Sequence, residues 1–302
     1  MRLAIATRSM NDFLYAASGE LLGLRCPRYR LTGTDNFGYF RELLRLDADW
    51  VISLDEDAFV FDPGRLLGLV RVMEEGGYAA CGMLDGGVVP IRRHNPAACN
   101  AYFNVFDLRR VRPVWEAWDR VRLATHRREY EGLVAPFARR TTFAFDHFER
   151  YYGAFFSLLD AGARFLYLDA EEWQDGVSTL LKDTVGAPLL LHCWYTRHWD
   201  TSYHTRIRCR AALDHARQAQ GLGPYRREPV EVGSDPRART VAMPATSSSP
   251  LFSEPGLPAI NDFIPPSARR VLDVGSGTGA VGQVGAGAVE DMESWTPESP
   301  SR

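Results

Sequence analysis

Two aspartates one residue apart, Asp55 and Asp57, are the side chains of this sequence best suited to metal chemistry. They follow directly from the apolar run at residues 50–54, which is typical of a central strand in a parallel sheet. Residues i and i+2 of extended chain point the same way, so the two carboxylates would converge while Glu56 points elsewhere. Carboxylates beside a diphosphate suit Mg²⁺ or Mn²⁺, and such an ion offsets the charge of a phosphate leaving group. A solvated acidic turn is the alternative for this triplet taken alone.

The elements that must position this pair alternate between strands and helices. Apolar runs bounded by turn residues predict strands at residues 2–7, 50–54, 78–83, 100–108, 164–168 and 189–193. Helical spacing and capping residues predict helices at residues 12–22, 36–46, 63–75, 114–122, 145–161 and 205–220. This order is typical of an α/β domain with a mostly parallel, Rossmann-like sheet flanked by helices. Ligands of such sheets bind beyond the carboxyl ends of the strands, where Asp55 and Asp57 lie.

The overall composition excludes several classes of protein. The chain has 302 residues and a formal net charge of −3, so it suits one large domain, alone or with a fragment, and gives no sign of binding nucleic acid. The five cysteines are widely spaced without a C-x-x-C motif, which favours free thiols over a disulfide framework. The first apolar run is too short for a signal peptide, and no run is long enough to span a membrane. We therefore expect a cytoplasmic protein.

The stretch at residues 49–60 resembles the D-x-D segment of GT-A-fold glycosyltransferases. The resemblance implies a nucleoside diphosphate sugar as donor and a divalent ion held by the aspartates. In that family the helix before the D-x-D strand carries a basic residue near the diphosphate, which is Arg41, or alternatively Arg45, in this chain. The end of the first strand contacts the nucleotide in that family, which here implies Thr7 and Arg8.

Further segments resemble the same family in the expected order. Residues 102–108 are similar to its F-N-x-G-V strand without the glycine, which implies that Asn104 faces the sugar. Asp146 resembles the acidic residue before the final helix, which contacts the donor sugar or acts near the acceptor, and it also suits a helix N-cap. Asp85, which follows a predicted strand, is a second candidate for a general base or merely fills a turn.

The late strand at residues 189–193 resembles the family's strand that ends in a metal-binding histidine. This likeness implies that His192 completes the metal site, and an imidazole beside two carboxylates suits Mn²⁺. Arg197 and His198 then occupy the positions of basic residues that contact phosphate in the family. Asp35 opens the helix before the D-x-D strand and is a candidate ligand-binding residue, with a simple helix cap as the alternative. The resemblance covers about residues 2–200.

The C-terminal part of the sequence has a different character. Residues 234–266 are rich in Ser, Pro, Ala and Thr, and residues 226–266 are interpreted as a linker. Residues 271–279 resemble the first motif of class I S-adenosylmethionine-dependent methyltransferases, whose glycines allow close approach of a ligand. Only 23 residues follow Gly279, and no strand is expected before Glu290 and Asp291. Residues 267–302 are therefore interpreted as a partial methyltransferase fragment.

The sequence as a whole predicts a glycosyltransferase domain at residues 1–225. It would use Mn²⁺ or Mg²⁺ and a nucleotide sugar, and its acceptor would be a glycan, a lipid, a protein or a small molecule. A nucleotidyltransferase is the first rival hypothesis, but such enzymes usually carry a glycine-rich basic loop after the first strand, and residues 8–12 contain no glycine. A methyltransferase is the second rival hypothesis, and a binding protein whose site has lost its activity is the third.

Overall fold

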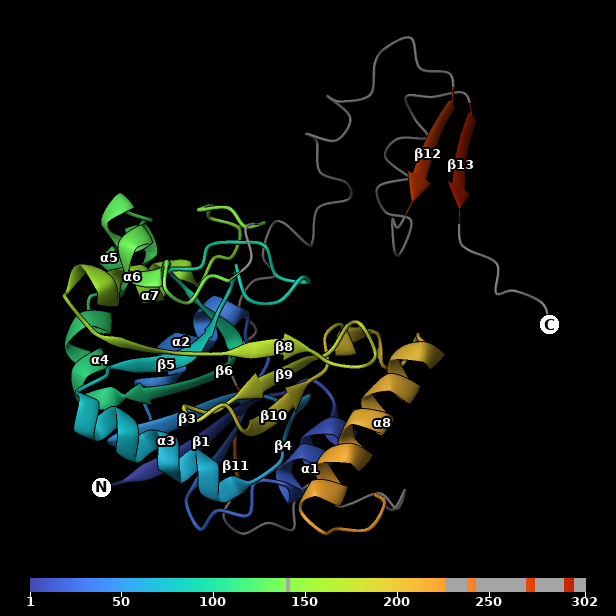
Figure 1. The fold of residues 1–302 in the computed structure, drawn as a ribbon, viewed down its shortest axis with the longest axis horizontal. Helices are drawn as coiled ribbons and strands as arrows, with labels where there is room; N and C mark the ends of the chain where they lie inside the picture. The colour runs from blue at the N-terminus through green and yellow to red at the C-terminus, as the bar shows by residue number, and fades with distance from the viewer. Residues whose placement is uncertain (140–141, 226–237, 243–269, 275–290, 296–302) are drawn as a thin grey trace. The chain divides into compact units, whose positions relative to one another are not determined.

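The computed structural model describes residues 1–139 and 142–225 with their side chains, and the backbone of residues 238–242, 270–274 and 291–295 (Figure 1). The chain forms two compact units, Met1–Pro244 and Ala245–Arg302. In the first unit a mostly parallel sheet is flanked by helices, which confirms the predicted α/β class.

The central sheet has seven strands in the order β11-β2-β1-β3-β6-β5-β7. They are β1 (Leu3–Arg8), β2 (Arg28–Thr32), β3 (Trp50–Asp55), β5 (Ala80–Leu84), β6 (Cys99–Asp107), β7 (Phe165–Leu168) and β11 (Ala238–Ala242). Only β6 runs antiparallel to its neighbours within this sheet. Strand β11 lies within the range interpreted as a linker, and it extends the sheet by pairing with β2.

A second, antiparallel sheet has the order β4-β10-β9-β8. Its strands are β4 (Ala58–Val60), β8 (Ala170–Glu172), β9 (Thr179–Lys182) and β10 (Pro188–His192). The chain passes from β3 of the central sheet to β4 of this sheet through Glu56 and Asp57. The predicted acidic triplet therefore lies where the two sheets meet.

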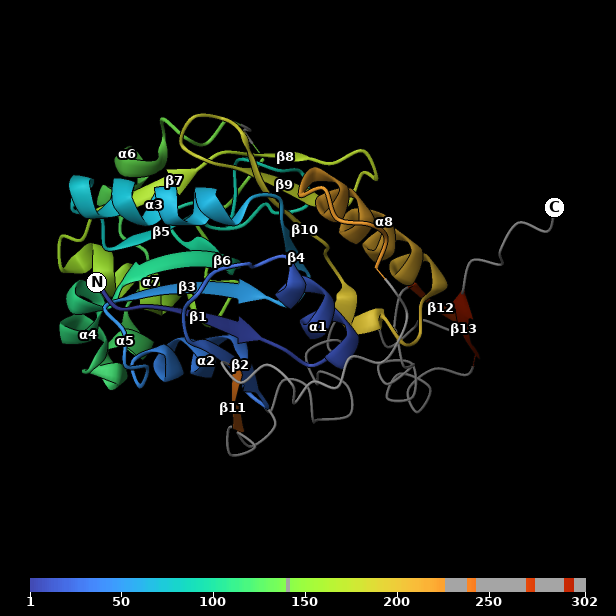
Figure 2. The same cartoon turned by 90° about the horizontal axis from the view of Figure 1, so that it is seen from below.

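The helices begin and end mostly where the capping residues predict. They are α1 (Asp12–Glu20), α2 (Asn36–Leu43), α3 (Pro63–Gly76), α4 (Leu108–Trp115), α5 (Trp118–Leu123), α6 (Glu131–Val134), α7 (Tyr152–Asp160) and α8 (Tyr203–Ala219), with short 3₁₀ turns at Arg128–Tyr130 and Thr196–His198. The side chain of Asn11 caps α1, and that of Asp62 caps α3. Gly77 ends α3 at φ +65°, a conformation that favours glycine. In Figures 1 and 2, α1 and α8 lie at one end of the first unit, and α4 and α5 at the other.

Two predicted helices differ from the structure. The helix predicted at residues 114–122 is instead α4 and α5, because the side chain of Asp107 caps α4 earlier in the chain. The helix predicted at residues 145–161 begins only at Tyr152. The preceding residues are held in the loop instead, since the N–H of Ala144 donates to the carbonyl of Arg93.

Aromatic side chains form the core beneath the central sheet. Phe40 of α2 is fully buried, and its ring packs against Phe106 of β6, Trp115 of α4 and Phe155 of α7. Each such side chain removes a large apolar area from water, so these contacts fix α2, α4 and α7 on the sheet. All five cysteines are buried and free, as expected. Among the residues described, no helix is both long and apolar enough to cross a bilayer.

The second unit contains a parallel pair of strands, β12 (Arg270–Val274) and β13 (Asp291–Trp295). Strand β12 confirms the strand predicted before the glycine-rich motif, and β13 begins at Asp291, after the residues at which no strand is expected. Residues 275–279, which carry the glycines of that motif, lie outside the described residues.

Candidate metal and ligand site

The candidate metal ligands come from both sheets. Asp55 is the last residue of β3, Asp57 directly precedes β4, and His192 is the last residue of β10. Strands β4 and β10 pair in a register that sets His192 opposite Ala58, next to Asp57. The N–H of Cys193 donates to the carbonyl oxygen of Asp57, 3.1 Å away, and holds the two strand ends together.

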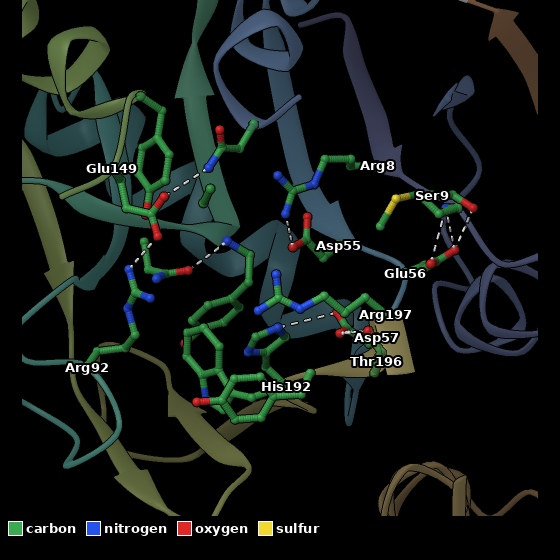
Figure 3. A pocket seen from close by; sticks show the side chains of 18 of the residues that line it. Arg8, Ser9, Asp55, Glu56, Asp57, Arg92, Glu149, His192, Thr196 and Arg197 are labelled. Atoms are coloured by element: carbon green, nitrogen blue, oxygen red, sulfur yellow. Dashed lines mark hydrogen bonds and ion pairs between the residues drawn. The ribbon is translucent and has the colours of Figure 1, made fainter. Parts of the chain in front are cut away.

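The three side chains offer ligand atoms that lie within 4.8 Å of one another (Figure 3). Nε2 of His192 is 3.3 Å from Oδ1 of Asp57. The side chain of Asp55 is 14% exposed, that of Asp57 8% and that of His192 4%. Two oxygen ligands and one nitrogen ligand at this separation suit Mn²⁺ or Mg²⁺.

Several polar atoms of this triad have no hydrogen-bond partner among the described residues. They are Oδ1 of Asp55, Nδ1 of His192 and Oδ1 of Asp57, the last of which has the 3.3 Å ion-pair contact with Nε2 of His192 instead of a hydrogen bond. Buried polar atoms without partners are costly, so native proteins rarely keep them without a ligand, an ion or a water. The residues present therefore fit a divalent cation.

The electrostatics of the two aspartates differ. Burial raises the pKa of Asp55, although Arg8 opposes this shift. Burial acts in the same direction on Asp57, but His192 and a hydrogen bond from Thr196 hold its pKa below the ordinary value. Asp57 is thus the better stabilised of the two carboxylates as an anion.

Two neighbours hold the aspartates in place. Nη2 of Arg8 lies 2.5 Å from Oδ2 of Asp55, and the hydroxyl of Thr196 donates to Oδ2 of Asp57 over 2.5 Å. Thr196 follows Tyr195, which adopts φ +67°, a left-handed conformation that is strained for a non-glycine residue. This turn brings Thr196 back over Asp57.

Glu56 points away from the metal triad, as the period of extended chain predicts. Its carboxylate accepts hydrogen bonds from the hydroxyl of Ser9 and from the N–H groups of Met10 and Asn11. Burial raises its pKa to about 7 despite these bonds. Glu56 therefore fixes the turn between β1 and α1 to the end of β3.

The triad borders a pocket of about 260 Å³, whose other wall is polar (Figure 3). Arg8 and Arg197 line it beside the aspartates, and Arg92 and Glu149 line it elsewhere. Nη2 of Arg92 is 2.9 Å from Oε1 of Glu149. The pocket thus combines two further basic groups near the triad with an acidic group on another wall.

The structure brings together five of the predicted site residues in this pocket: Arg8, Asp55, Asp57, His192 and Arg197. Arg8 contacts Asp55 directly, so the basic residue beside the candidate metal ligands comes from β1. Arg41 is exposed on α2 and does not line the pocket. The expected helix is present, but it presents other residues to the site.

Four further predicted ligand-binding residues also lie outside the pocket lining. Thr7 is buried within β1. Asp35 caps α2 by accepting from the N–H of Gly38, as the helix-cap alternative predicts. Asn104 is fully buried in β6, where its amide donates to the carbonyl of Cys81. His198 is exposed at the end of the 3₁₀ turn.

The two predicted general bases are engaged elsewhere. Asp85 is fully buried and accepts from four side chains, one of which is Arg92. Asp146 lies 2.9 Å from Nδ1 of His94, outside the pocket lining, and is not the cap of a helix. Glu149, three residues after Asp146, is the acidic residue of this segment that reaches the pocket.

Sequence reasoning misses Arg92, Glu149, Asn36 and Thr196 as pocket residues. Arg92 lies in a loop without periodicity, and Glu149 lies within a segment whose pattern predicts a helix. Asn36 follows Asp35 directly, so its position next to a candidate is the only signal that the sequence carries for it.

Comparison with known proteins gives partial structural matches only. No protein-family model and no curated protein sequence matches this chain. A mannosyltransferase from Pyrobaculum calidifontis, in complex with GDP-Man and Mn²⁺, is similar over 56% of this chain and 55% of its own, with 10% identity and a TM-score of 0.35. The match thus spans about half the length of that enzyme. A CMP:2-keto-3-deoxy-manno-octonic acid synthetase complexed with CTP is similar over 57% of this chain and 90% of its own, with 10% identity and a TM-score of 0.33.

Proposed function

We propose that this protein transfers a sugar from a nucleoside diphosphate donor to an acceptor, with Mn²⁺ or Mg²⁺ bound by Asp55, Asp57 and His192. The observation that carries the proposal is the buried triad, whose unpartnered ligand atoms border a pocket. The acceptor is a glycan, a lipid, a protein or a small molecule.

The charges around the triad favour a diphosphate. A bound divalent cation supplies positive charge that offsets the charge developing on the departing diphosphate. Arg8 and Arg197 add two positive charges beside the two aspartates, so the metal-loaded end of the pocket carries a formal charge of about +2. Arginine binds phosphate oxygens well through its planar fork. In this proposal Arg197, which is exposed at the rim, contacts the phosphates, while Arg8 holds Asp55 in place.

One contact favours sugar transfer over nucleotide transfer. Nucleotidyltransferases usually carry a glycine-rich loop after the first strand, and backbone N–H groups in such a loop can bind phosphate. Here the N–H groups of Met10 and Asn11 donate to the carboxylate of Glu56. Because the Glu56 carboxylate already accepts from these N–H groups, they are less available to a phosphate group. This contact supports the glycosyltransferase proposal.

A thermal-shift experiment on the purified full chain tests the proposal. UDP, GDP, CDP and S-adenosylmethionine are each added with and without Mn²⁺, because a ligand that binds only the folded state raises Tm. At 100 times its Kd, a ligand adds about 2.7 kcal/mol, which corresponds to a rise of roughly 5–10 °C for a domain of this size. We expect such a rise with one nucleoside diphosphate, and only when Mn²⁺ is present.

Two variants make the test specific. Asp57→Asn keeps the shape of the side chain and should abolish the Mn²⁺-dependent rise. Asp200→Asn removes an exposed carboxylate from the region after His192 and should retain the rise. A rise that is independent of Mn²⁺, or that survives in Asp57→Asn, would contradict the metal site. A rise with S-adenosylmethionine alone would favour a methyltransferase.

A further inference from the structure

The wall of the pocket that contains Arg92 and Glu149 is rigidly built. Arg92 donates through Nε and Nη2 to the two carboxylate oxygens of Asp85, each over 2.6 Å. Asp85 is itself fully buried and accepts from Asn100, Tyr151 and Tyr152. A guanidinium held in this two-point fork has little rotational freedom. Arg92 is therefore fixed before any ligand binds.

Glu149 is held from two sides and keeps acceptor capacity. Its Oε1 accepts from Nη2 of Arg92 over 2.9 Å, and its Oε2 accepts from Nδ2 of Asn36 over 3.1 Å. A carboxylate oxygen has two lone-pair positions, so each oxygen has room for one more donor. The side chain is 21% exposed and lines the pocket. Two adjacent acceptors of this kind match a pair of neighbouring sugar hydroxyls.

An aromatic surface lies beside this pair. Trp194 lines the pocket, and its ring lies 5.5 Å from the guanidinium carbon of Arg92. The indole N–H donates to the hydroxyl of Thr179 over 2.8 Å, which fixes the plane of the ring. Sugar rings present apolar C–H groups as well as hydroxyls, and aromatic rings supply a matching apolar surface. The wall thus offers both kinds of contact that an uncharged pyranose needs.

The charge of this wall restricts the sugar. Asp85 and Glu149 contribute two formal negative charges and Arg92 one positive charge, which leaves a net charge of about −1 beside the pocket. Arg92 brings no surplus positive charge to a ligand carboxylate, because two protein carboxylates already share its charge. A carboxylate on the ligand would meet like charge in a partly buried environment, which weakens binding.

Resting on the proposed function, we infer that Glu149, Arg92 and Asn36 form the sugar subsite, and that this subsite selects neutral hexoses and rejects sugars that carry a carboxylate. The metal triad and Arg197 then bind the diphosphate, while Glu149 binds hydroxyl groups of the sugar. Figure 3 shows Glu149 and Arg92 on a different side of the pocket from the metal triad and Arg197.

Isothermal titration calorimetry with Mn²⁺ tests this inference on the full chain. The probes share one base: UDP, UDP-glucose, UDP-glucuronate and UDP-glucuronamide, or the GDP-mannose series if GDP is the base that binds. The wild type should bind the uronate at least about tenfold more weakly than the hexose. The uronamide, which is neutral, should regain most of that loss, and this comparison needs no variant.

Glu149→Gln should reduce the difference between uronate and hexose by about tenfold, because it removes the charge and keeps the size of the side chain. Its Kd for UDP alone should stay unchanged, since the diphosphate lies at the metal side. The matched control is Asp146→Asn, an acid of the same segment outside the pocket lining, which should leave the difference unchanged.

The outcomes separate this inference from the proposed function. Normal binding of the nucleoside diphosphate with Mn²⁺, but equal affinity for uronate and hexose, would overturn the sugar subsite alone. An unchanged difference in Glu149→Gln, with a normal Tm in the absence of ligand, would do the same. If no nucleoside diphosphate binds to the wild type with Mn²⁺, both proposals fall.

Discussion

Arg8 ends β1 directly opposite Asp55, the last residue of β3, and the two side chains form an ion pair of 2.5 Å. Both groups are mostly buried, with 24% and 14% of their side chains exposed. The parallel register of the two strands therefore places the guanidinium of Arg8 beside the carboxylate of Asp55, which is a proposed metal ligand. The stability of this strand end and its ligand binding should depend on the same pair.

Replacing Arg8 by Met should destabilise the protein by about 1–3 kcal/mol, because it leaves Asp55 mostly buried without its counter-charge. Urea denaturation at pH 7 measures the loss. Mn²⁺ should restore part of it, since the cation neutralises the same carboxylate. The control is Arg2→Met, whose ion pairs with Asp47 and Asp49 involve a 60% exposed arginine and should contribute about 1 kcal/mol or less. An Arg8→Met protein as stable as the wild type would mean that solvent, and not Arg8, balances Asp55.

Glu56→Gln should destabilise the protein by about 1–3 kcal/mol. Both carboxylate oxygens of Glu56 accept from backbone N–H groups, and the glutamine would replace one of these oxygens by an NH₂ group that cannot accept. Thermal or urea unfolding gives the magnitude. Binding of a nucleoside diphosphate with Mn²⁺ should persist, because Glu56 points away from the triad. Glu172→Gln, at an exposed position in β8, provides a comparison and should change stability little. A loss of metal binding in Glu56→Gln with unchanged stability would place Glu56 among the ligands.

Asp183 gives the fold a predictable pH dependence. Burial opposes its ionisation, but the N–H groups of Ala187 and Val185 and the guanidinium of Arg65 lower its pKa. A carboxyl whose pKa is lowered by folding contributes stability above its unfolded pKa, about 3.9, and loses it as the pH falls through the folded pKa. Asp183→Asn should therefore lower the free energy of unfolding by about 1 kcal/mol at pH 7. The value is small because Arg65 is partly exposed and solvent screens its charge.

Unfolding by urea from pH 7 down to pH 2 tests this sign. The stability difference between the wild type and Asp183→Asn should shrink as the pH falls below about 4. A difference that grows as the pH falls would mean that folding raises the pKa of Asp183 instead of lowering it.

A pair of glycines tests the loop that carries Arg92. A Cβ at Gly86 would lie 1.9 Å from the carbonyl oxygen of His94, whereas a Cβ at Gly68 would meet nothing within 4 Å. Gly86→Ala should destabilise by more than about 2 kcal/mol and should also weaken sugar binding, because the loop must shift. Gly68→Ala, within α3, should stabilise by about 0.5–1 kcal/mol. Tm measures the stability of both variants and calorimetry measures their sugar binding. Equal changes in Tm for the two variants would contradict the close approach of Gly86 to His94.

The parts of the site that the sequence predicts are those set by local geometry. In extended chain, alternate side chains share a face, so Asp55 and Asp57 lie together and Glu56 points away. This arrangement follows from the local sequence around β3 alone. The prediction of His192 depends on the order of segments along the chain, and this order comes from the resemblance. Its closeness to Asp57 then follows from the pairing of β10 with β4.

The parts that it does not predict depend on contacts distant in sequence. Arg92 and Glu149 are 57 positions apart, and they meet because a loop without periodicity lies against a segment whose pattern predicts a helix. The sequence pattern favours Asp146 as the residue before a helix, but a backbone bond from Ala144 to Arg93 delays that helix until Tyr152. The local sequence around Ala144 or Arg93 does not predict this hydrogen bond.

The candidate ligands are divided between two sheets, and this division affects how the protein opens. Asp57 and His192, which would share the ion, lie far apart in the sequence, so a bound ion would act as a cross-link across a very long loop. Removing it would release the β9–β10 hairpin and the turn after His192 as a local unit, while the central sheet stays closed. The amide protons of this hairpin should then exchange faster with solvent without metal, which makes exchange protection in this region a gauge of occupancy independent of turnover.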